Sequence, residues 1–167
     1  MNKECIIQQL QNKKIVILGF GKEGISSYRF IRSHFPELPL VIADRNSSLD
    51  TSPYHEDPLL SFVLGADYDQ NLSDFDCILK TPGVNLNHLS YFIPRNKIYS
   101  QTDLFLSAFH AQTIGVTGTK GKSTTASLIY HILKNEKENV FLAGNIGIPF
   151  FDIIEKIDEE TIIVAEL

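Results

Sequence analysis

The stretch KIVILGFGKEG, at residues 14–24, decides the fold of the first half of the chain. It joins an apolar run of strand length to the pattern G-x-G-x-x-G, and an amphipathic stretch follows over residues 24–35. A second apolar run, at residues 40–44, ends in an aspartate. This order predicts a strand, a helix and a second, parallel strand, which is the opening unit of a Rossmann-like sheet.

The three glycines of this turn, Gly19, Gly21 and Gly24, suit a nucleotide site. The first two permit a tight turn and a close approach of a ligand to the backbone, and the third lets the helix pack on the strand. Free N–H groups at the helix start attract phosphate, and Asp44 can accept a hydrogen bond from a ribose hydroxyl. The motif does not decide between NAD, FAD and a sugar nucleotide, and a purely structural glycine turn is the alternative.

Further apolar runs of strand length lie at residues 60–64, 77–80 and 97–99, and a short helix is expected at residues 86–93. Their alternation with amphipathic stretches predicts an α/β fold with a mostly parallel sheet. The segment Thr-Pro-Gly-Val at residues 81–84 directly follows a strand. We expect it to reach the ligand crevice at the carboxyl edge of the sheet, with a plain Pro-Gly turn as the alternative.

The same alternation begins again near residue 112. Strands are expected at residues 112–117, 140–142 and 162–165, and a helix at residues 122–135. Because each half carries its own glycine-rich turn, we expect a Rossmann-like parallel-sheet domain over residues 1–108 and the start of a P-loop-type ATPase domain over residues 109–167. One continuous sheet is the alternative. No helix follows the last strand to cover it, so we expect an N-terminal fragment of a longer protein.

A second glycine-rich loop precedes the helix of this half and consists of Gly118, Thr119, Lys120, Gly121, Lys122, Ser123 and Thr124. Its ending, Gly-Lys-Ser, is typical of a loop whose N–H groups bind the phosphates of ATP. Lys122 would reach the β and γ phosphates, and the Ser123 hydroxyl would face Mg²⁺. The full pattern G-x-x-x-x-G-K-[ST] is not met, because Val116 stands at its first glycine position and Gly118 must supply the flexibility.

The apolar strand at residues 162–165 is followed by Glu166, and a carboxylate at such a strand end can hold Mg²⁺. An acid with nothing to bind is the alternative. Asn145 lies in the polar turn Gly-Asn-Ile-Gly at residues 144–147, which should lie at the same edge of the sheet.

Composition argues against several classes of protein. Fifteen Lys and Arg against 20 Asp and Glu give a net charge of −5, so a broad basic surface for nucleic acid is not expected. No apolar run approaches the ~18 residues of a membrane span, and no membrane partner is expected. Cys5 and Cys77 are in neither disulfide nor zinc spacing, the five histidines have no ligand spacing, and the N-terminus lacks a signal sequence. A cytoplasmic location is the expectation.

Taken together, these motifs resemble those of the Mur ligases, which are ATP-dependent amide-forming enzymes of peptidoglycan synthesis. The likeness rests on the first glycine turn, Asp44 with Arg45, the Thr-Pro-Gly segment, the phosphate-binding loop, the Gly-Asn-Ile-Gly turn and the strand before Glu166. In this family a UDP-binding domain precedes an ATPase domain and an amino-acid-binding domain. The resemblance implies contacts to the UDP substrate from Gly19, Gly21, Lys22, Glu23, Gly24, Asp44, Arg45, Thr81, Pro82, Gly83 and Asn145.

The resemblance also implies roles for the second loop. Residues 118–124 would bind the ATP phosphates, Lys122 would be the catalytic cation, and Ser123 with Glu166 would hold Mg²⁺. Lys120 departs from the asparagine that is common at this position of the family.

Among the family's reactions, the motifs are most similar to those of the step that joins D-glutamate to UDP-N-acetylmuramoyl-L-alanine. ATP would phosphorylate the substrate's carboxylate, and the amine of D-glutamate would attack the acyl phosphate with loss of phosphate. A monomer is expected. The chain is expected to be inactive alone, because the family's amino-acid-binding residues lie beyond Leu167. The alternatives are an NAD-type oxidoreductase domain, another Mur ligase step, a folate-adding ligase and a sugar-nucleotide module with a degenerate ATPase segment.

Overall fold

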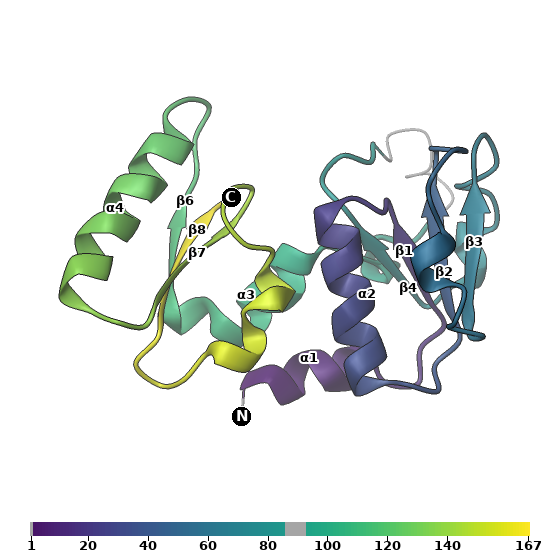
Figure 1. The fold of residues 1–167 in the computed structure, drawn as a ribbon, viewed down its shortest axis with the longest axis horizontal. Coiled ribbons are helices and arrows are strands. Elements are labelled where there is room, and N and C mark those ends of the chain that lie inside the picture. The colour runs from purple at the N-terminus through teal and green to yellow at the C-terminus, as the bar shows by residue number, and fades with distance from the viewer. Residues whose placement is uncertain (1, 86–92) are drawn as a thin grey trace. The chain divides into compact units, whose positions relative to one another are not determined.

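The computed structural model describes residues 2–85 and 93–167, and the chain forms two compact units (Figure 1). One unit is Ile7–Gln101, and the other is Thr102–Leu167 together with the N-terminal residues up to Ile6. Both consist of parallel strands with helices, so the expected α/β class is confirmed.

The first unit is built on a five-stranded sheet in the order β3-β2-β1-β4-β5, with every neighbouring pair parallel. The central strand β1 is fully buried, and its last residue, Leu18, lies opposite Ala43 on one side and Lys80 on the other. The carboxyl ends of three strands therefore meet at one edge. The strands are β1 (Ile15–Leu18), β2 (Leu40–Asp44), β3 (Leu60–Leu64), β4 (Cys77–Lys80) and β5 (Ile98–Tyr99).

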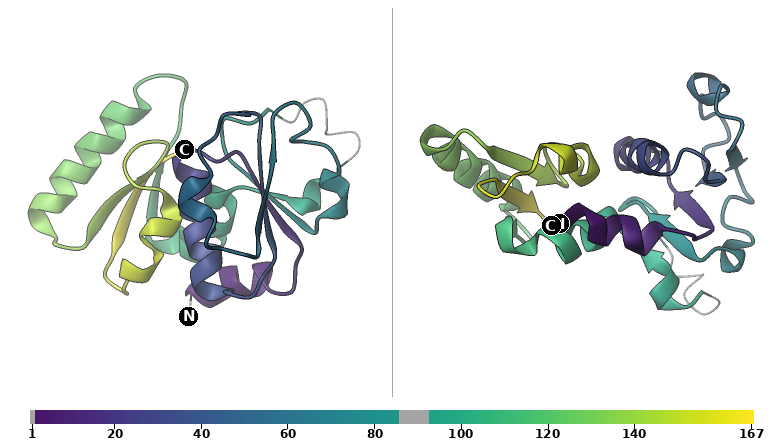
Figure 2. Two further views of the ribbon diagram at one scale, coloured as in Figure 1. Left: turned by 45° about the vertical axis from the view of Figure 1, so that its right-hand side comes forward. Right: turned by 90° about the horizontal axis from the view of Figure 1, so that it is seen from below.

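Helices and apolar loop residues cover this sheet, as a parallel sheet buried on both faces requires. Helix α2 (Lys22–His34) follows β1 directly and lies beside the strands of this sheet (Figure 2). Its Phe30 and Ile31 are buried. Helix α1 (Asn2–Leu10) spans the boundary between the two units, and Leu10, in the part that belongs to this unit, is buried. One core cluster gathers Val16, Leu18, Ala43, Leu72, Phe75, Ile78 and Ile93.

The second unit has a three-stranded parallel sheet in the order β6-β8-β7, so the strand that comes last in sequence lies in the middle. Its strands are β6 (Thr113–Val116), β7 (Val140–Gly144) and β8 (Ile162–Glu166). Helix α4 (Lys122–Glu136) packs on this sheet through a core that includes Ala126, Val116, Val140 and Val164. Helix α3 (Gln101–Phe109) leads into the unit, and its Phe105 stacks on Phe150 at 4.5 Å between ring centroids.

Short 3₁₀ segments complete the described structure. They are η1 (Ser52–Tyr54), η2 (Leu72–Asp74), η3 (Arg95–Lys97), η4 (His110–Gln112), η5 (Phe150–Asp152) and η6 (Ile154–Lys156). Within the described part of the chain, no helix has both the length and the apolar character needed to cross a membrane.

Every strand that the sequence predicts is present, with small differences at the ends. Lys97 belongs to a 3₁₀ turn rather than to β5, and β7 runs two residues further than expected, to Gly144. The helix expected at residues 86–93 lies outside the described residues, apart from Ile93, which is buried and not helical.

Candidate functional site

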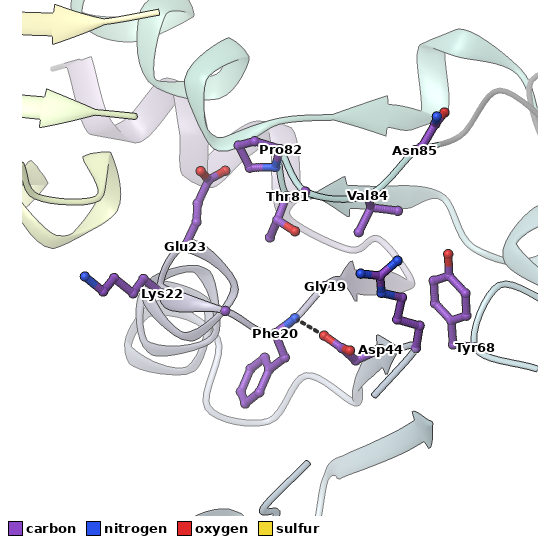
Figure 3. A pocket seen from close by; sticks show the side chains of 13 residues that line it. Gly19, Phe20, Lys22, Glu23, Asp44, Tyr68, Thr81, Pro82, Val84 and Asn85 are labelled. Atoms are coloured by element: carbon purple, nitrogen blue, oxygen red, sulfur yellow. Dashed lines mark hydrogen bonds between the residues drawn. The ribbon is translucent and has the colours of Figure 1, made fainter. Parts of the chain in front are cut away.

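A cavity of about 340 Å³ opens at the carboxyl edge of the first sheet (Figure 3). The loops that follow β1, β2, β3 and β4 all contribute to it. It is lined by Gly19, Phe20, Gly21, Lys22, Glu23, Asp44, Arg45, Tyr68, Thr81, Pro82, Gly83, Val84 and Asn85. The structure thus brings together most of the residues that the resemblance assigns to the UDP substrate; Gly24 and Asn145 do not line this cavity.

The glycine turn at this cavity is held by close backbone packing. Gly19 has a φ of +94°, and a Cβ there would lie 2.1 Å from Thr81 Oγ1. A Cβ on Gly24 would lie 2.2 Å from the Gly19 carbonyl oxygen. A Cβ on Gly21, by contrast, would meet no atom within 4 Å. Gly19 and Gly24 are therefore required by the fold, whereas the space at Gly21 is left open beside the cavity.

Asp44 fixes the same turn through its carboxylate. Oδ2 accepts a hydrogen bond of 2.7 Å from the backbone N–H of Phe20, as Figure 3 shows, and Oδ1 accepts one of 2.8 Å from Asn46 N–H. Each carboxylate oxygen keeps a further lone pair for a ligand hydroxyl. The contact to ribose that the sequence predicts stays a prediction, and the structure adds a role in shaping the turn.

Thr81 ties the third loop to the same edge. Its side chain is buried, and Oγ1 donates a 3.2 Å hydrogen bond to the carbonyl of Leu18, the last residue of β1. Lys80 Nζ donates to the Thr81 carbonyl at 2.9 Å. Pro82 and Gly83 are held at the rim of the cavity by these bonds.

The charged side chains of the cavity differ in their surroundings. Lys22 is exposed, and Figure 3 shows it extending away from Asp44 and Tyr68. Glu23 is half-buried, and burial raises the pKa of its carboxyl above the ordinary value, although a hydrogen bond from the Gln101 backbone and the charge of Lys80 act in the opposite direction.

Two lining residues, Tyr68 and Asn85, were not anticipated from the sequence, whereas Phe20 and Val84 belong to segments expected at the site but had no role of their own. Burial is the largest cause that raises the pKa of Tyr68, and Asp69 and Asp44 add to it while Arg45 lowers it. The charges of Asp44 and Arg45, at the end of β2, therefore act on the Tyr68 hydroxyl. Tyr68 comes from a loop without any motif, so only the fold could place it here.

The second glycine-rich loop lies between β6 and α4 and is exposed. Gly118 and Gly121 have φ values of +144° and +76°, which side chains other than glycine rarely adopt. Lys122 Nζ donates a 2.8 Å hydrogen bond to the Gly118 carbonyl, so the loop is closed by its own lysine. The first N–H groups of α4 have no partner within the helix and can receive an anion.

Strand register gathers the other predicted residues of this half at one edge. Glu166 lies opposite Val116 on β6 and opposite Gly144 on β7, and Asn145 N–H donates a 3.0 Å hydrogen bond to the Glu166 carbonyl. Glu166 is only 7% exposed, and its Oε2 has no hydrogen-bond partner among the described residues.

An unpartnered, buried carboxylate oxygen suits a divalent cation, because a buried negative charge is costly unless it is paired. The described residues hold no cluster of three or more His, Cys, Asp or Glu side chains that could bind a metal alone. Mg²⁺ commonly takes one or two protein ligands and completes its shell with water and phosphate oxygens. The unpartnered Oε2 of Glu166 can supply one such ligand; a contribution from Ser123, which is exposed, stays a prediction.

Comparisons with known proteins point in one direction. Residues 116–165 match the family described as the Mur ligase middle domain. The UDP-N-acetylmuramoylalanine–D-glutamate ligase of Clostridium kluyveri is 38% identical over 172 aligned residues, which cover 96% of this chain and 36% of that protein. Those of Clostridium tetani and Leuconostoc mesenteroides are each 30% identical, over 95% and 94% of this chain and 35% and 36% of their own lengths. This chain thus spans about a third of the length of these relatives. By these matches the chain is similar to the Mur ligases, and its residues 116–165 match the family of their middle domain.

Proposed function

We propose that this chain provides two nucleotide sites of a Mur ligase that acts in peptidoglycan synthesis. The cavity of the first unit binds the UDP part of UDP-N-acetylmuramoyl-L-alanine, and the loop at residues 118–124 binds ATP with Mg²⁺. The observation that carries the proposal is the gathering of the predicted UDP-contacting residues around one cavity.

The chemistry of the cavity suits a diphosphate attached to a ribose. The N–H groups at the start of α2 and the open space at Gly21 offer a place for phosphate beside the backbone. Arg45 and Lys22 supply positive charge, and Asp44 offers lone pairs to a hydroxyl. An aromatic ring at Tyr68 and the apolar Val84 complete a surface on which a base can pack.

The chemistry of the second loop suits the transfer of a phosphoryl group. Lys122 would exchange its bond to Gly118 for the phosphates and neutralise charge on the group that is transferred. Ser123 and Glu166 would hold Mg²⁺, which supplies further charge neutralisation when bound. The substrate's carboxylate takes the γ-phosphoryl group, and the amine of D-glutamate then displaces phosphate to form the amide.

Calorimetric titration of the chain with UDP-N-acetylmuramoyl-L-alanine, with NAD as comparator, tests the first site. We expect heat of binding from the UDP compound and none from NAD. Binding of NAD instead would make the first unit a dinucleotide module, which is the alternative from the oxidoreductase class. UDP-N-acetylmuramic acid without alanine is a third ligand, and tighter binding of it would favour another step of the pathway.

Two arginine variants locate the binding. Arg45→Ala removes a cation that lines the cavity, and Arg29→Ala removes an exposed cation on α2 that does not. We expect the first to weaken binding of the UDP compound and the second to leave it unchanged. Equal effects of both variants would show that the positive charges attract the UDP compound nonspecifically. If the unmodified chain binds none of the ligands, the first site is removed from the proposal.

A further inference from the structure

Gln101, a residue to which neither the motifs nor the comparisons give a role, is buried against the helix that begins at the cavity. Only 1% of its surface is exposed, and it stands at the start of α3, 78 residues after Glu23 in the sequence. A buried carboxamide is costly unless its polar atoms are bonded, so its partners show what it is for.

Three partners of its side-chain Nε2 among the described residues lie on the first turns of α2. Gln101 Nε2 donates to Ser27 Oγ at 3.0 Å, to the Glu23 carbonyl at 3.2 Å and to Ser26 Oγ at 3.3 Å. Ser27 Oγ itself donates to the Glu23 carbonyl at 2.9 Å. Both serines are 1% exposed, so the inward face of the helix start is a polar network where apolar side chains would be expected.

The same residue also holds the side chain of Glu23. A hydrogen bond from the backbone of Gln101 reaches the Glu23 carboxyl, which lines the cavity on its other side. Glu23 and Pro82 both line the cavity, and both are labelled in Figure 3. Gln101 thus bonds Glu23 at its carbonyl through the carboxamide and at its carboxyl through the main chain.

We propose that Gln101 is a positioning residue for the nucleotide cavity: from behind α2 it fixes the helix turn that carries Lys22 and Glu23 and that offers its N–H groups to the ligand. This rests on the proposed function of the first unit. A phosphate contact depends on distances of a few tenths of an ångström, so a turn fixed before the ligand arrives binds more tightly than one the ligand must order.

The held position of Glu23 has a consequence for pH dependence. The groups that face it are Lys80 on β4 and the Gln101 backbone, with Lys22 on its own helix and Asp44 and Arg45 across the cavity. Burial raises the Glu23 pKa, so its negative charge forms at higher pH than usual and then repels a diphosphate. Affinity for the UDP compound should fall as pH rises through this pKa.

The test uses the 167-residue chain and UDP-N-acetylmuramoyl-L-alanine, whose diphosphate diester keeps its charge across the pH range used. Gln101→Ala should lower affinity about tenfold, a difference of about 1.4 kcal/mol, and should move the pH at which affinity falls toward the ordinary pKa of Glu. Gln101→Glu, which has the length but not the N–H donors, should fail to restore affinity. Glu23→Gln should make affinity independent of pH.

Gln112 provides the matched control in the other unit. Like Gln101 Nε2, its Nε2 has more than one acceptor: it donates to the backbone carbonyls of Asp158 at 2.6 Å and of Thr161 at 3.1 Å. None of these residues lines the nucleotide cavity. Gln112→Ala should lower thermal stability and leave both affinity and pH profile unchanged. Equal affinities of the Gln101→Ala and unmodified chains, or equal pH profiles, would overturn the positioning role, and failure of the unmodified chain to bind would instead overturn the proposed function on which it rests.

Discussion

The two glycine-rich turns of this chain look alike in sequence and differ in how they are held. Both follow a parallel strand and begin a helix. The first is fixed from outside: Asp44 bonds the Phe20 N–H, Thr81 bonds the end of β1, and Gly24 packs on Gly19. The second is exposed, and within the described part of the chain the bond from its own Lys122 to the Gly118 carbonyl closes it.

This difference teaches how each turn would gain its affinity. A turn already in position spends little binding energy on being ordered, whereas the second loop must break its internal lysine bond before the ammonium can meet phosphate. We therefore expect substitutions around the first turn to change stability together with binding. Substitutions in the second loop should change binding alone.

The largest effect is expected at Gly24. A Cβ 2.2 Å from the Gly19 carbonyl forces the helix off the strand, so Gly24→Ala should lower the free energy of unfolding by about 3 kcal/mol, measured in urea. Gly21→Ala is the matched control, since nothing lies within 4 Å of its Cβ, and its cost should stay within about 1 kcal/mol. Similar losses in the free energy of unfolding at Gly24 and Gly21 would contradict the inference that close packing at Gly24 holds the first turn.

Substitution of Lys122 should change ligand binding and leave stability almost unchanged. Lys122→Ala would remove the proposed charge-assisted hydrogen bond to phosphate, so Mg-ATP affinity should fall by about 2 kcal/mol in a calorimetric titration. Because the loop is exposed, the urea midpoint should hardly move, and binding of the UDP compound should be retained. Lys134→Ala, on the same helix, is the control for loss of charge. Loss of both ligands together would contradict the assignment of two separate sites.

Asp44 should combine both effects. Asp44→Ala leaves the Phe20 and Asn46 N–H groups unbonded and would remove the proposed ribose acceptor, so affinity for the UDP compound should fall by about 1.5 to 3 kcal/mol, with some loss of stability. Asp76, whose carboxylate accepts the Lys14 N–H at 3.0 Å at the other end of β4, is the control. Its change to alanine should cost stability without any change in affinity; an equal loss of affinity would separate Asp44 from the site.

The smallest effect is expected at Glu166. Replacing its buried carboxylate by the neutral amide in Glu166→Gln should raise the free energy of unfolding in Mg²⁺-free buffer by about 1 kcal/mol. The same change should weaken the binding of Mg-ATP, a gain in stability at the expense of function. Glu160→Gln, at an exposed turn, should alter neither quantity. A destabilised Glu166→Gln chain would mean that the carboxylate has a structural partner.

Much of the fold could be predicted from the sequence, because apolar runs of strand length lie between clear turn residues. The parallel strands of both sheets and helices α2 and α4 follow from that pattern alone. The glycine turn, Asp44 and the Thr81 segment could be placed at one cavity because the carboxyl ends of parallel strands share an edge. Local pattern and topology agree in these segments.

The remaining parts of the site depend on contacts between residues distant in sequence. Tyr68 reaches the cavity from a loop without any motif, and Gln101 bonds a helix 74 residues or more away. The carboxylate of Asp44 was expected to serve a ligand, but it also accepts two backbone N–H groups. No periodicity records such pairings, so they become visible only when the chain is folded.

The order of strands also sets the order in which each sheet can be assembled. In the first unit the middle strand β1 is the earliest in sequence, and each later strand can join an edge that already exists. In the second, β6 and β7 do not pair with each other, and both wait for β8, which begins 46 residues after the end of β6 at Val116. During synthesis two apolar edges are therefore exposed until residue 162 has left the ribosome. Slow, chaperone-sensitive maturation is the expected cost of placing β8 between two strands that precede it in the sequence.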